Sequence, residues 1–247
     1  MGATYMKHKG PSVDLVDSSG SDLTVANSAR VSFNKTSDWD YVDNGAFGQK
    51  RVLSERDKKL IKYLAKHNHW TPFAHCFVTF RVTCCIAVAR QLHKHQVGLV
   101  VNEVSRRYVS DEPTFYVPDV LRGKAVDKKQ GSSGTVLNWD YGYYDHGQGD
   151  NSDCGPVEFA YYACLDSYKA MLERGVCEEQ ARLVLPLGMN TEFVWSGSLA
   201  AWARVINLRT SEDAQKETRD VAELIAQHIK QLYPVSYEAL CGKDNRA

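Results

Sequence analysis

The chain has 247 residues, enough for one sizeable domain with its own hydrophobic core. Its 30 basic and 30 acidic side chains balance, which excludes a general polyanion-binding surface, so any anion site has to be local. The seven cysteines are odd in number and include no C-x-x-C pair, which argues against a disulfide framework or a zinc-thiolate site. The N-terminus lacks a signal-like apolar segment, and no apolar run approaches the ~20 residues of a membrane span. We expect a soluble, cytoplasmic protein without nucleic-acid or membrane partners.

An amphipathic helix is expected after Ser54. Ser54 is a good capping residue, and the apolar positions between 60 and 65 fall on one face of a helix that ends near His67. Residues 77–82 then alternate in polarity and are rich in β-forming types, which predicts a strand with one polar face. From Cys85 the apolar spacing changes to a helical period, so a second helix is expected there.

Residues 122–155 contain seven of the 17 glycines together with a tyrosine-rich stretch. We expect a long loop or insertion here rather than a linker, because aromatic residues are poor material for a flexible spacer. Pro156 suits the first turn of a following helix that ends at Gly175. Two further helices are expected over 199–209 and 213–232, the latter with a clear apolar stripe.

The densest group of polar and charged side chains lies between Arg90 and Tyr108. Within it, Ser105, Arg106 and Arg107 offer a hydroxyl donor and two forked cations in sequence, which suits a phosphate group. A solvated basic strand edge would have the same composition, and the run taken alone favours that interpretation, since charge runs usually lie on the surface. The context in the rest of the sequence has to decide between a phosphate site and a solvated strand edge.

That context is a set of ordered blocks. H-W-T-P-F-A-H at 69–75, followed by F-V-T-F, resembles the H-x-[ST]-P-F-x-H…F-x-F segment of the flavin-dependent thymidylate synthases. The stretch 90–108 is similar to the family's R-Q-x-x-R-H-R…N-E-x-S-x-R-Y pattern. Two later blocks, at 179–186 and 207–217, resemble its E-x-A-R-x-V-L-P and L-R-x-D-x-x-A-Q-x-E, and S-A-R-V-S at 28–32 also fits. Four ordered blocks along most of the chain are far more specific than one short motif.

The chain departs from the family pattern at several positions. Lys94 and Gln96 replace the two arginines of the family's R-H-R triplet, and eight residues rather than seven separate Gln96 from Ser105. Arg204 and Asp213 stand where many relatives have Asn and His. Because a lysine cannot reproduce a bidentate guanidinium fork, we expect weaker stabilisation of the reduced flavin anion.

The resemblance implies roles at the matching positions. Eight residues would bind deoxyuridine monophosphate (dUMP): Gln91, Lys94, Glu103, Ser105, Arg106, Arg107, Arg182 and Arg209. Ten residues would bind FAD: His69, Thr71, Lys94, His95, Gln96, Glu103, Ser198, Leu199, Ala200 and Arg204. Residues 198–200 would reach in from another subunit, because the family's active sites lie between the chains of a homotetramer. Arg209 would be the catalytic residue, and no metal is implied.

The expected chemistry is consistent with these residue types. C5 of uracil is a weak nucleophile, and a guanidinium that stabilises negative charge on the ring raises its electron density. A reduced flavin carries negative charge near N1 and C2, where Lys94, His95 and Gln96 could contact it. The family does not require a cysteine to add to the ring, so none of the cysteines needs a catalytic role.

We therefore expect a single α+β domain over 1–247, with a mainly antiparallel sheet packed by helices, that assembles as a homotetramer. The resemblance implies reductive methylation of dUMP to dTMP. The carbon donor would be 5,10-methylenetetrahydrofolate, and FAD reduced by NADPH would carry the hydride.

Three other functions stay open. The pairs His67/His69 and His93/His95 could ligate a metal, although positions i and i+2 of a helix point in different directions. Basic residues near Tyr108 and later aromatics could stack nucleic-acid bases, although such aromatics more often pack within a sheet. A relative with the same fold could instead hydroxymethylate its substrate, use a cytosine nucleotide, or bind a nucleotide without catalysis.

Overall fold

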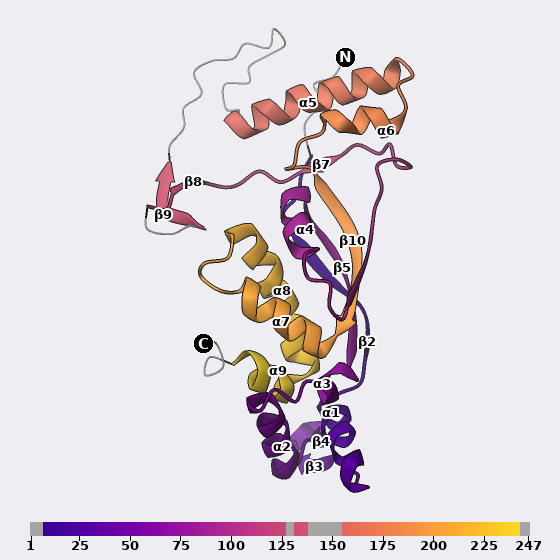
Figure 1. Cartoon of the computed structure of the whole chain (residues 1–247), viewed down its shortest axis with the longest axis vertical. Helices are drawn as coiled ribbons and strands as arrows, with labels where there is room; N and C mark the ends of the chain where they lie inside the picture. The colour runs from indigo at the N-terminus through magenta and orange to yellow at the C-terminus, as the bar shows by residue number, and fades with distance from the viewer. Residues whose placement is uncertain (1–6, 127–130, 138–154, 243–247) are drawn as a thin grey trace.

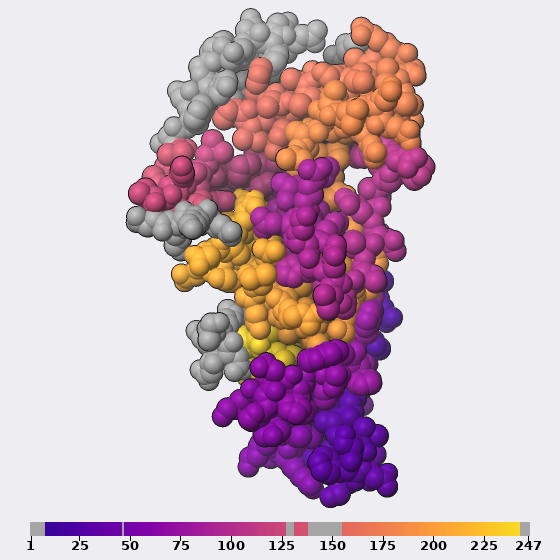
Figure 2. Space-filling model, in the orientation of Figure 1, coloured from indigo at the N-terminus to yellow at the C-terminus, as the bar shows by residue number. Residues whose placement is uncertain are grey.

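The computed structural model describes residues 7–126, 131–137 and 155–242. The molecule is elongated, and three parts follow one another along its long axis (Figures 1 and 2). An N-terminal helical part lies at one end, a sheet covered by helices lies in the middle, and a smaller helical part lies at the other end. Within this described part, no helix is both long and apolar enough to cross a membrane.

A four-stranded antiparallel sheet forms the centre of the fold, which confirms the predicted mixture of helices with an antiparallel sheet. Its strands, in spatial order, are β2 (Ser12–Ser19), β5 (Phe77–Cys85), β10 (Asn190–Ser198) and β6 (Leu99–Glu103). The strand predicted over 77–82 is confirmed. It extends to Cys85 because residues 83–85 are buried and also pair with β10.

Helices cover one face of this sheet (Figure 1). They are α4 (Ile86–Leu92), α7 (Leu199–Arg209) and α8 (Lys216–Leu232). The short helix α9 (Pro234–Cys241) packs against α7 and α8. Alternate side chains of β5, among them Val78 and Phe80, are fully buried in this core, as the two-residue period of a strand requires. Trp202 of α7 lies edge-on to Phe80, with ring centroids 5.0 Å apart, and donates its indole N–H to the Val78 carbonyl at 3.2 Å. This packing fixes α7 and therefore the position of Arg209 at its end.

The N-terminal part contains short helices and a small hairpin. Its elements are α1 (Asp22–Arg30), η1 (Val31–Phe33), β3 (Asp40–Asp43), η2 (Gly45–Phe47), β4 (Gln49–Val52), α2 (Glu55–Lys66) and α3 (Thr71–Ala74). The helix predicted after Ser54 is confirmed, and the Ser54 hydroxyl accepts from the Asp57 N–H at 3.1 Å. Burial alone would raise the pKa of Asp57, but hydrogen bonds from Ser54 and the buried Arg30 lower it. A paired ionised carboxylate therefore joins α1 to α2.

A second, smaller core lies beyond the other end of the sheet. Here α5 (Pro156–Glu173), α6 (Glu178–Ala181) and η3 (Arg182–Val184) pack near the parallel pair β1 (Lys7–His8) and β7 (Thr114–Phe115). The helix predicted from Pro156 is confirmed, and Gly175 follows it with a φ of 83°. Of the aromatic residues near Tyr108, Phe115 lies in a strand of two residues and is buried, whereas Tyr108 lies in an exposed turn.

Part of the stretch predicted at 122–155 as a long loop or insertion is a β-hairpin, so the loop interpretation is wrong for that part. Strand β8 (Leu121–Lys124) pairs antiparallel with β9 (Ser132–Leu137). Arg122 ties the hairpin to α8 by donating from Nη2 to Glu217 at 2.5 Å, a long-range contact that local sequence patterns do not contain. The tyrosine-rich stretch at 141–144 lies outside the described residues.

The helices predicted from Cys85 onward are present, with one corrected start and one additional helix. The helix predicted from Cys85 is α4, with Cys85 as its capping residue, and α7 has the predicted bounds. The helix predicted over 213–232 begins only at Lys216, because Ser211 and Ala214 close a turn in which the Ala214 N–H donates to the Ser211 carbonyl at 3.0 Å. The sequence pattern did not predict α9, which begins at Pro234.

Candidate functional site

Nine of the residues expected to bind nucleotide or flavin line three hollows. The Arg209 hollow, of about 540 Å³, is lined by residues that include Gln91, Arg122, Ser132, Arg209, Gln215 and Glu217. The Ser105 hollow, of about 370 Å³, is lined by residues that include Arg90, His93, Glu103, Ser105, Arg106 and Arg182. The His69 hollow, of about 460 Å³, is lined by residues that include Asn68, His69, Trp70, Ala200, Arg204 and Asn207.

Arg209 and His95 form a hydrogen-bonded pair at the Arg209 hollow. Arg209 is the last residue of α7, and its Nε donates to His95 Nε2 at 2.9 Å. Burial lowers the pKa of His95, and the charges of Arg209 and Arg204 lower it further. The imidazole is therefore neutral near pH 7 and accepts this bond without competing for the positive charge. Neither terminal nitrogen of Arg209 has a hydrogen-bond partner among the described residues, so both can serve a ligand.

Gln91 lies on α4 and faces the same hollow as Arg209. Its amide donates to Gln215 at 2.9 Å and accepts from the Thr218 hydroxyl at 2.8 Å. Gln215 in turn donates to Glu217 at 3.0 Å. The side chain is therefore held in place by its own chain.

The Ser105 hollow combines cations, a hydroxyl and one carboxylate. Glu103, the last residue of β6, accepts from the Thr191 hydroxyl at 2.6 Å and lies 3.9 Å from His93 Nδ1. Burial lowers the pKa of His93, although the charge of Glu103 opposes that shift. Arg106 and Arg182 line the hollow beside Ser105, which gives it the forked donors that a phosphate prefers.

Two buried nitrogens of the Ser105 hollow lack partners. His93 Nε2 and Arg106 Nε are both buried and make no hydrogen bond with the described residues. Arg106 also donates from Nη1 to the Asp111 carbonyl. Buried polar atoms without partners are uncommon in folded proteins and often mark a place where a ligand or another chain supplies them.

Seven expected nucleotide or flavin ligands do not line the three hollows: Thr71, Lys94, His95, Gln96, Arg107, Ser198 and Leu199. Arg107 donates to Glu179 at 2.6 Å on the surface, and its guanidinium lies 5.4 Å from the centroid of the Tyr108 ring. Lys94 and Gln96 have exposed side chains. In a single chain, the Lys-His-Gln triplet therefore brings only His95 against Arg209.

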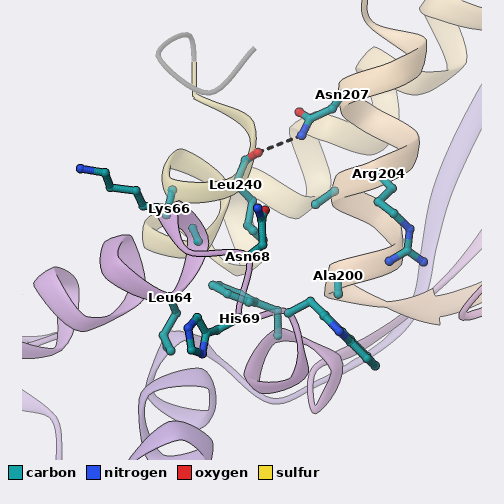
Figure 3. A pocket seen from close by; sticks show the side chains of 13 residues that line it. Leu64, Lys66, Asn68, His69, Ala200, Arg204, Asn207 and Leu240 are labelled. Atoms are coloured by element: carbon teal, nitrogen blue, oxygen red, sulfur yellow. Dashed lines mark hydrogen bonds between the residues drawn. The ribbon is translucent and has the colours of Figure 1, made fainter. Parts of the chain in front are cut away.

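The His69 hollow lies between the end of α2 and the helices α7 and α9, and Figure 3 shows its lining side chains. Asn207 donates from Nδ2 to the Leu240 carbonyl at 2.9 Å, whereas its Oδ1 is buried and has no partner among the described residues. Arg204 is held by a hydrogen bond of 2.5 Å to the Val97 carbonyl. Cationic, amide and aromatic groups thus surround this space together with His69.

The other expected flavin ligands have different environments. Thr71 is exposed at the first position of α3. Ser198 caps α7 by accepting from the Ala201 N–H at 3.3 Å. Leu199 is wholly buried in the core of its own chain, so this conformation does not expose it to a ligand.

Helix α4 separates the two hollows that hold the expected nucleotide ligands. Arg90 lines the Ser105 hollow and Gln91 lines the Arg209 hollow, because consecutive residues of a helix point in different directions. One chain therefore brings Gln91 together with Arg209, and Ser105 together with Arg106 and Arg182. It does not bring the two groups together.

The sequence motifs did not identify several lining residues as ligands. Gln215, Glu217 and Asn207 lie inside the block at 207–217, so the signal that could have identified them was present. Arg122 lies in the predicted loop, where sequence spacing gives no indication of its neighbours.

Cysteines do not line these three hollows. Cys76, Cys84, Cys85 and Cys241 are buried, and burial raises the pKa of the Cys76 thiol to about 12. Among the residues that the structure describes, no group of three or more His, Cys, Asp or Glu side chains is placed to hold a metal ion.

The chain matches a known protein family and is similar to named members of it over most of its length. The family model described as thymidylate synthase complementing protein matches residues 14–235. The chain is 34% identical over 227 residues to a flavin-dependent thymidylate synthase of Thermus thermophilus, an alignment that covers 92% of this chain and 74% of that protein. It is 35% identical over 225 residues to the enzyme of the same name from Thermosipho africanus, covering 91% of this chain and 88% of that protein.

A solved structure is similar as well. The UMP/dUMP methylase PolB from Streptomyces cacaoi, bound with 5-Br dUMP, superposes with a TM-score of 0.73 at 31% identity, covering 95% of this chain and 96% of PolB. The same methylase bound with 5-Br UMP gives a TM-score of 0.72 at 29% identity. The chain therefore belongs to the thymidylate synthase complementing protein family, the flavin-dependent thymidylate synthases, and is an enzyme of the methyltransferase class.

Proposed function

We propose that this enzyme methylates dUMP to dTMP, with 5,10-methylenetetrahydrofolate as the carbon donor and NADPH-reduced FAD as the hydride carrier. The observation that carries the proposal is that Arg209, held by neutral His95, shares a polar hollow with Gln91. The names of the similar proteins support it, since the relatives are flavin-dependent thymidylate synthases and PolB is a dUMP methylase.

Arg209 activates the base in this proposal. Its terminal nitrogens face the uracil ring and stabilise the negative charge that develops when N3 loses its proton, which raises the electron density at C5. His95 accepts from Nε and so fixes the plane of the guanidinium. The charge is placed before the reaction begins, and no side chain has to reorganise during the step.

Phosphate binding falls to the Ser105 hollow. Ser105, Arg106 and Arg182 provide a hydroxyl and two forked cations. A phosphate oxygen would also accept from the buried Arg106 Nε, which has no partner among the described residues. Because α4 separates this hollow from Arg209, we propose that a complete site joins the Arg209 hollow of one subunit to the Ser105 hollow of another in a homotetramer.

The His69 hollow has the donor set that a flavin requires. The exposed Trp70 side chain offers flat apolar surface, Arg204 offers positive charge, and the unpartnered Asn207 Oδ1 offers an acceptor to a ring or amino N–H. Bound there, FAD supplies the hydride that completes the new methyl group. The residues that would hold it are His69, Ala200, Arg204 and Asn207, with Lys94 and Gln96 contributed at a subunit boundary.

The Lys-His-Gln triplet should stabilise the reduced flavin anion less than the Arg-His-Arg triplet of relatives, because one guanidinium is replaced by an ammonium and the other by a neutral amide. Measurement of the flavin reduction potential tests this point. A potential no lower than that of an Arg-His-Arg relative would refute it.

Tritium release from [5-³H]dUMP tests the proposed reaction. The assay contains FAD, NADPH and methylenetetrahydrofolate, and each is omitted in turn. Release that needs all three, with dTMP as the product, is the expected result. Nucleotide binding without release would contradict the proposal and indicate a relative that has lost the chemistry.

UMP is a second candidate substrate. The specific observation is that the similar methylase PolB is named for both nucleotides and was solved with 5-Br UMP as well as with 5-Br dUMP. The same assay with [5-³H]UMP decides it, because release comparable to that from dUMP would add the ribonucleotide to the substrates.

A further inference from the structure

A continuous series of hydrogen bonds runs along one wall of the Arg209 hollow. Arg122 donates from Nη2 to Glu217 Oε1 at 2.5 Å, and Gln215 donates from Nε2 to Glu217 Oε2 at 3.0 Å. Gln91 donates from Nε2 to Gln215 Oε1 at 2.9 Å. The Thr218 hydroxyl donates to Gln91 Oε1 at 2.8 Å. The series connects the β8–β9 hairpin to α4 through the start of α8.

Glu217 sets the direction of the bonds between the amides. A carboxylate can only accept, so Gln215 has to turn its amino group toward Glu217. The Gln215 carbonyl then faces Gln91, which has to present its own amino group. Gln91 consequently keeps its carbonyl toward Thr218 and retains one N–H and one carbonyl lone pair for a ligand.

Glu217 is well suited to orient the Gln215 and Gln91 amides, because it is nearly buried and ionised. Its side chain is only 11% exposed. Burial alone would raise the pKa of Glu217, but the hydrogen bonds from Arg122 and Gln215 outweigh burial and lower it. The carboxylate therefore stays ionised and cannot become a donor near neutral pH. The orientation of the neighbouring amides does not depend on solvent.

We propose that Glu217 is a positioning residue that fixes the orientation of the Gln91 amide and thereby makes the Arg209 hollow selective for uracil over cytosine nucleotides. This inference rests on the proposed function, because it assigns the base of the nucleotide to this hollow. Gln91 shares the hollow with Arg209, whereas the expected phosphate ligands Arg106 and Arg182 line a different one.

The chemistry of the two bases explains why the orientation matters. Uracil presents an N3–H donor between two carbonyl acceptors, whereas cytosine presents an N3 acceptor beside an amino donor at C4. A glutamine amide that can flip pairs with either edge. An amide held in one orientation offers its donor and its acceptor in fixed places and matches one base only.

Glu217→Gln tests the proposal because it keeps the size of the side chain and removes the requirement to accept. Its carbonyl would face Arg122 and its amino group would face Gln215, so Gln215 and then Gln91 would turn over. Thr218 tolerates the change, since a hydroxyl can accept as well as donate. The FAD-loaded enzyme should lose its preference for dUMP.

Isothermal titration of dUMP and dCMP into FAD-loaded enzyme measures that preference. We expect the wild type to favour dUMP by roughly tenfold to a hundredfold, the range for one bidentate amide contact. In Glu217→Gln the ratio of the two Kd values should fall to near one or invert. A purely structural role would weaken both nucleotides alike and leave the ratio unchanged.

Glu223→Gln is the matched control, because it makes the same chemical change farther along α8, where Glu223 is exposed and outside the three hollows. It should leave the ratio of the two Kd values unchanged. If circular dichroism shows that Glu217→Gln does not fold, Gln215→Met interrupts the series without a new polar group and should abolish the preference in the same way.

The outcomes separate this inference from the proposed function. A wild type that binds both nucleotides equally, or a variant that keeps the wild-type ratio, overturns the inference while dUMP methylation stands. A wild type that binds neither nucleotide and releases no tritium overturns the proposed function and the inference together.

Discussion

The hollows on the two sides of α4 differ in how their polar groups are satisfied. In the Arg209 hollow, Gln91, Gln215 and Glu217 hydrogen-bond one another, and Arg209 is held by His95. In the Ser105 hollow, buried nitrogens of His93 and Arg106 have no partners among the described residues.

This difference indicates that the chain alone orients the polar groups of the Arg209 hollow, whereas the Ser105 hollow keeps donors that only a ligand would satisfy. Oriented groups that do not move during the reaction are what charge stabilisation at a reacting ring requires. A phosphate brings strong acceptors of its own, so its site can leave donors unpaired until it binds. We interpret the Arg209 hollow as the half for the base and the Ser105 hollow as the half for the phosphate.

Removal of Arg209 should have the largest effect. We expect Arg209→Ala to lower the rate of tritium release by about a thousandfold, as for loss of a preorganised charge at a reacting centre. The fold should persist, because Arg209 lies at the end of α7 and its side chain bonds to His95 rather than to the core. Arg174→Ala removes another arginine at a helix end, exposed and outside the three hollows, and should be silent. Normal turnover in Arg209→Ala would eliminate the mechanism.

Removal of Arg182 should act mainly on nucleotide binding. We expect Arg182→Ala to raise the KM for dUMP by about ten- to a hundredfold, because a forked contact to the phosphate is lost while the base half is intact. Arg107→Ala should have a smaller effect, since Arg107 pairs with Glu179 on the surface. Steady-state kinetics over a range of dUMP concentrations distinguish KM from kcat. An equal loss in both variants would show that the division between the hollows is wrong.

Mixed assemblies test whether the two halves come from different chains. Arg209→Ala and Arg182→Ala subunits, each nearly inactive at low dUMP, should recover activity when they are coexpressed. If subunits assemble at random, about a quarter of the sites combine two wild-type halves. Tritium release from purified mixed tetramers provides the measurement. Activity no higher than that of either variant alone would place both halves in one subunit.

Acid sensitivity should be the smallest effect. Burial lowers the pKa of His95 below its ordinary value of 6.5, so the unfolded chain binds the proton more readily than the folded one. Stability is therefore complete above about pH 6.5 and is lost as the pH falls through the lowered pKa. His95→Gln should reduce this loss, because the amide can accept from Arg209 without titrating. Urea denaturation at several pH values measures it, and identical profiles for both proteins would contradict this account.

The accuracy of the sequence-based expectations varied with the range of the interactions involved. The strand at 77–82 and the helix at 199–209 were predicted closely, because their apolar periods match the faces that the core buries. The start of α8 was placed three residues early, since a turn closed by Ser211 and Ala214 gives no periodic signal. The pairing of β8 with β9 was missed, because glycine-rich strands with few buried side chains give little periodic signal and the contact with Glu217 joins residues far apart in the chain.

The sequence by itself determined the family, the alternation of elements and the candidate ligands, because these depend on residue types at fixed local spacing. Only the tertiary structure decided that Arg90 and Gln91 face different hollows, and that Arg107 pairs with Glu179 rather than lining the Ser105 hollow. It also brought Arg122 to Glu217 and so set the hydrogen bonds that hold Gln91. The Arg122–Glu217 and Gln91–Gln215 bonds join residues 95 and 124 positions apart, and their geometry follows from how the sheet and helices pack.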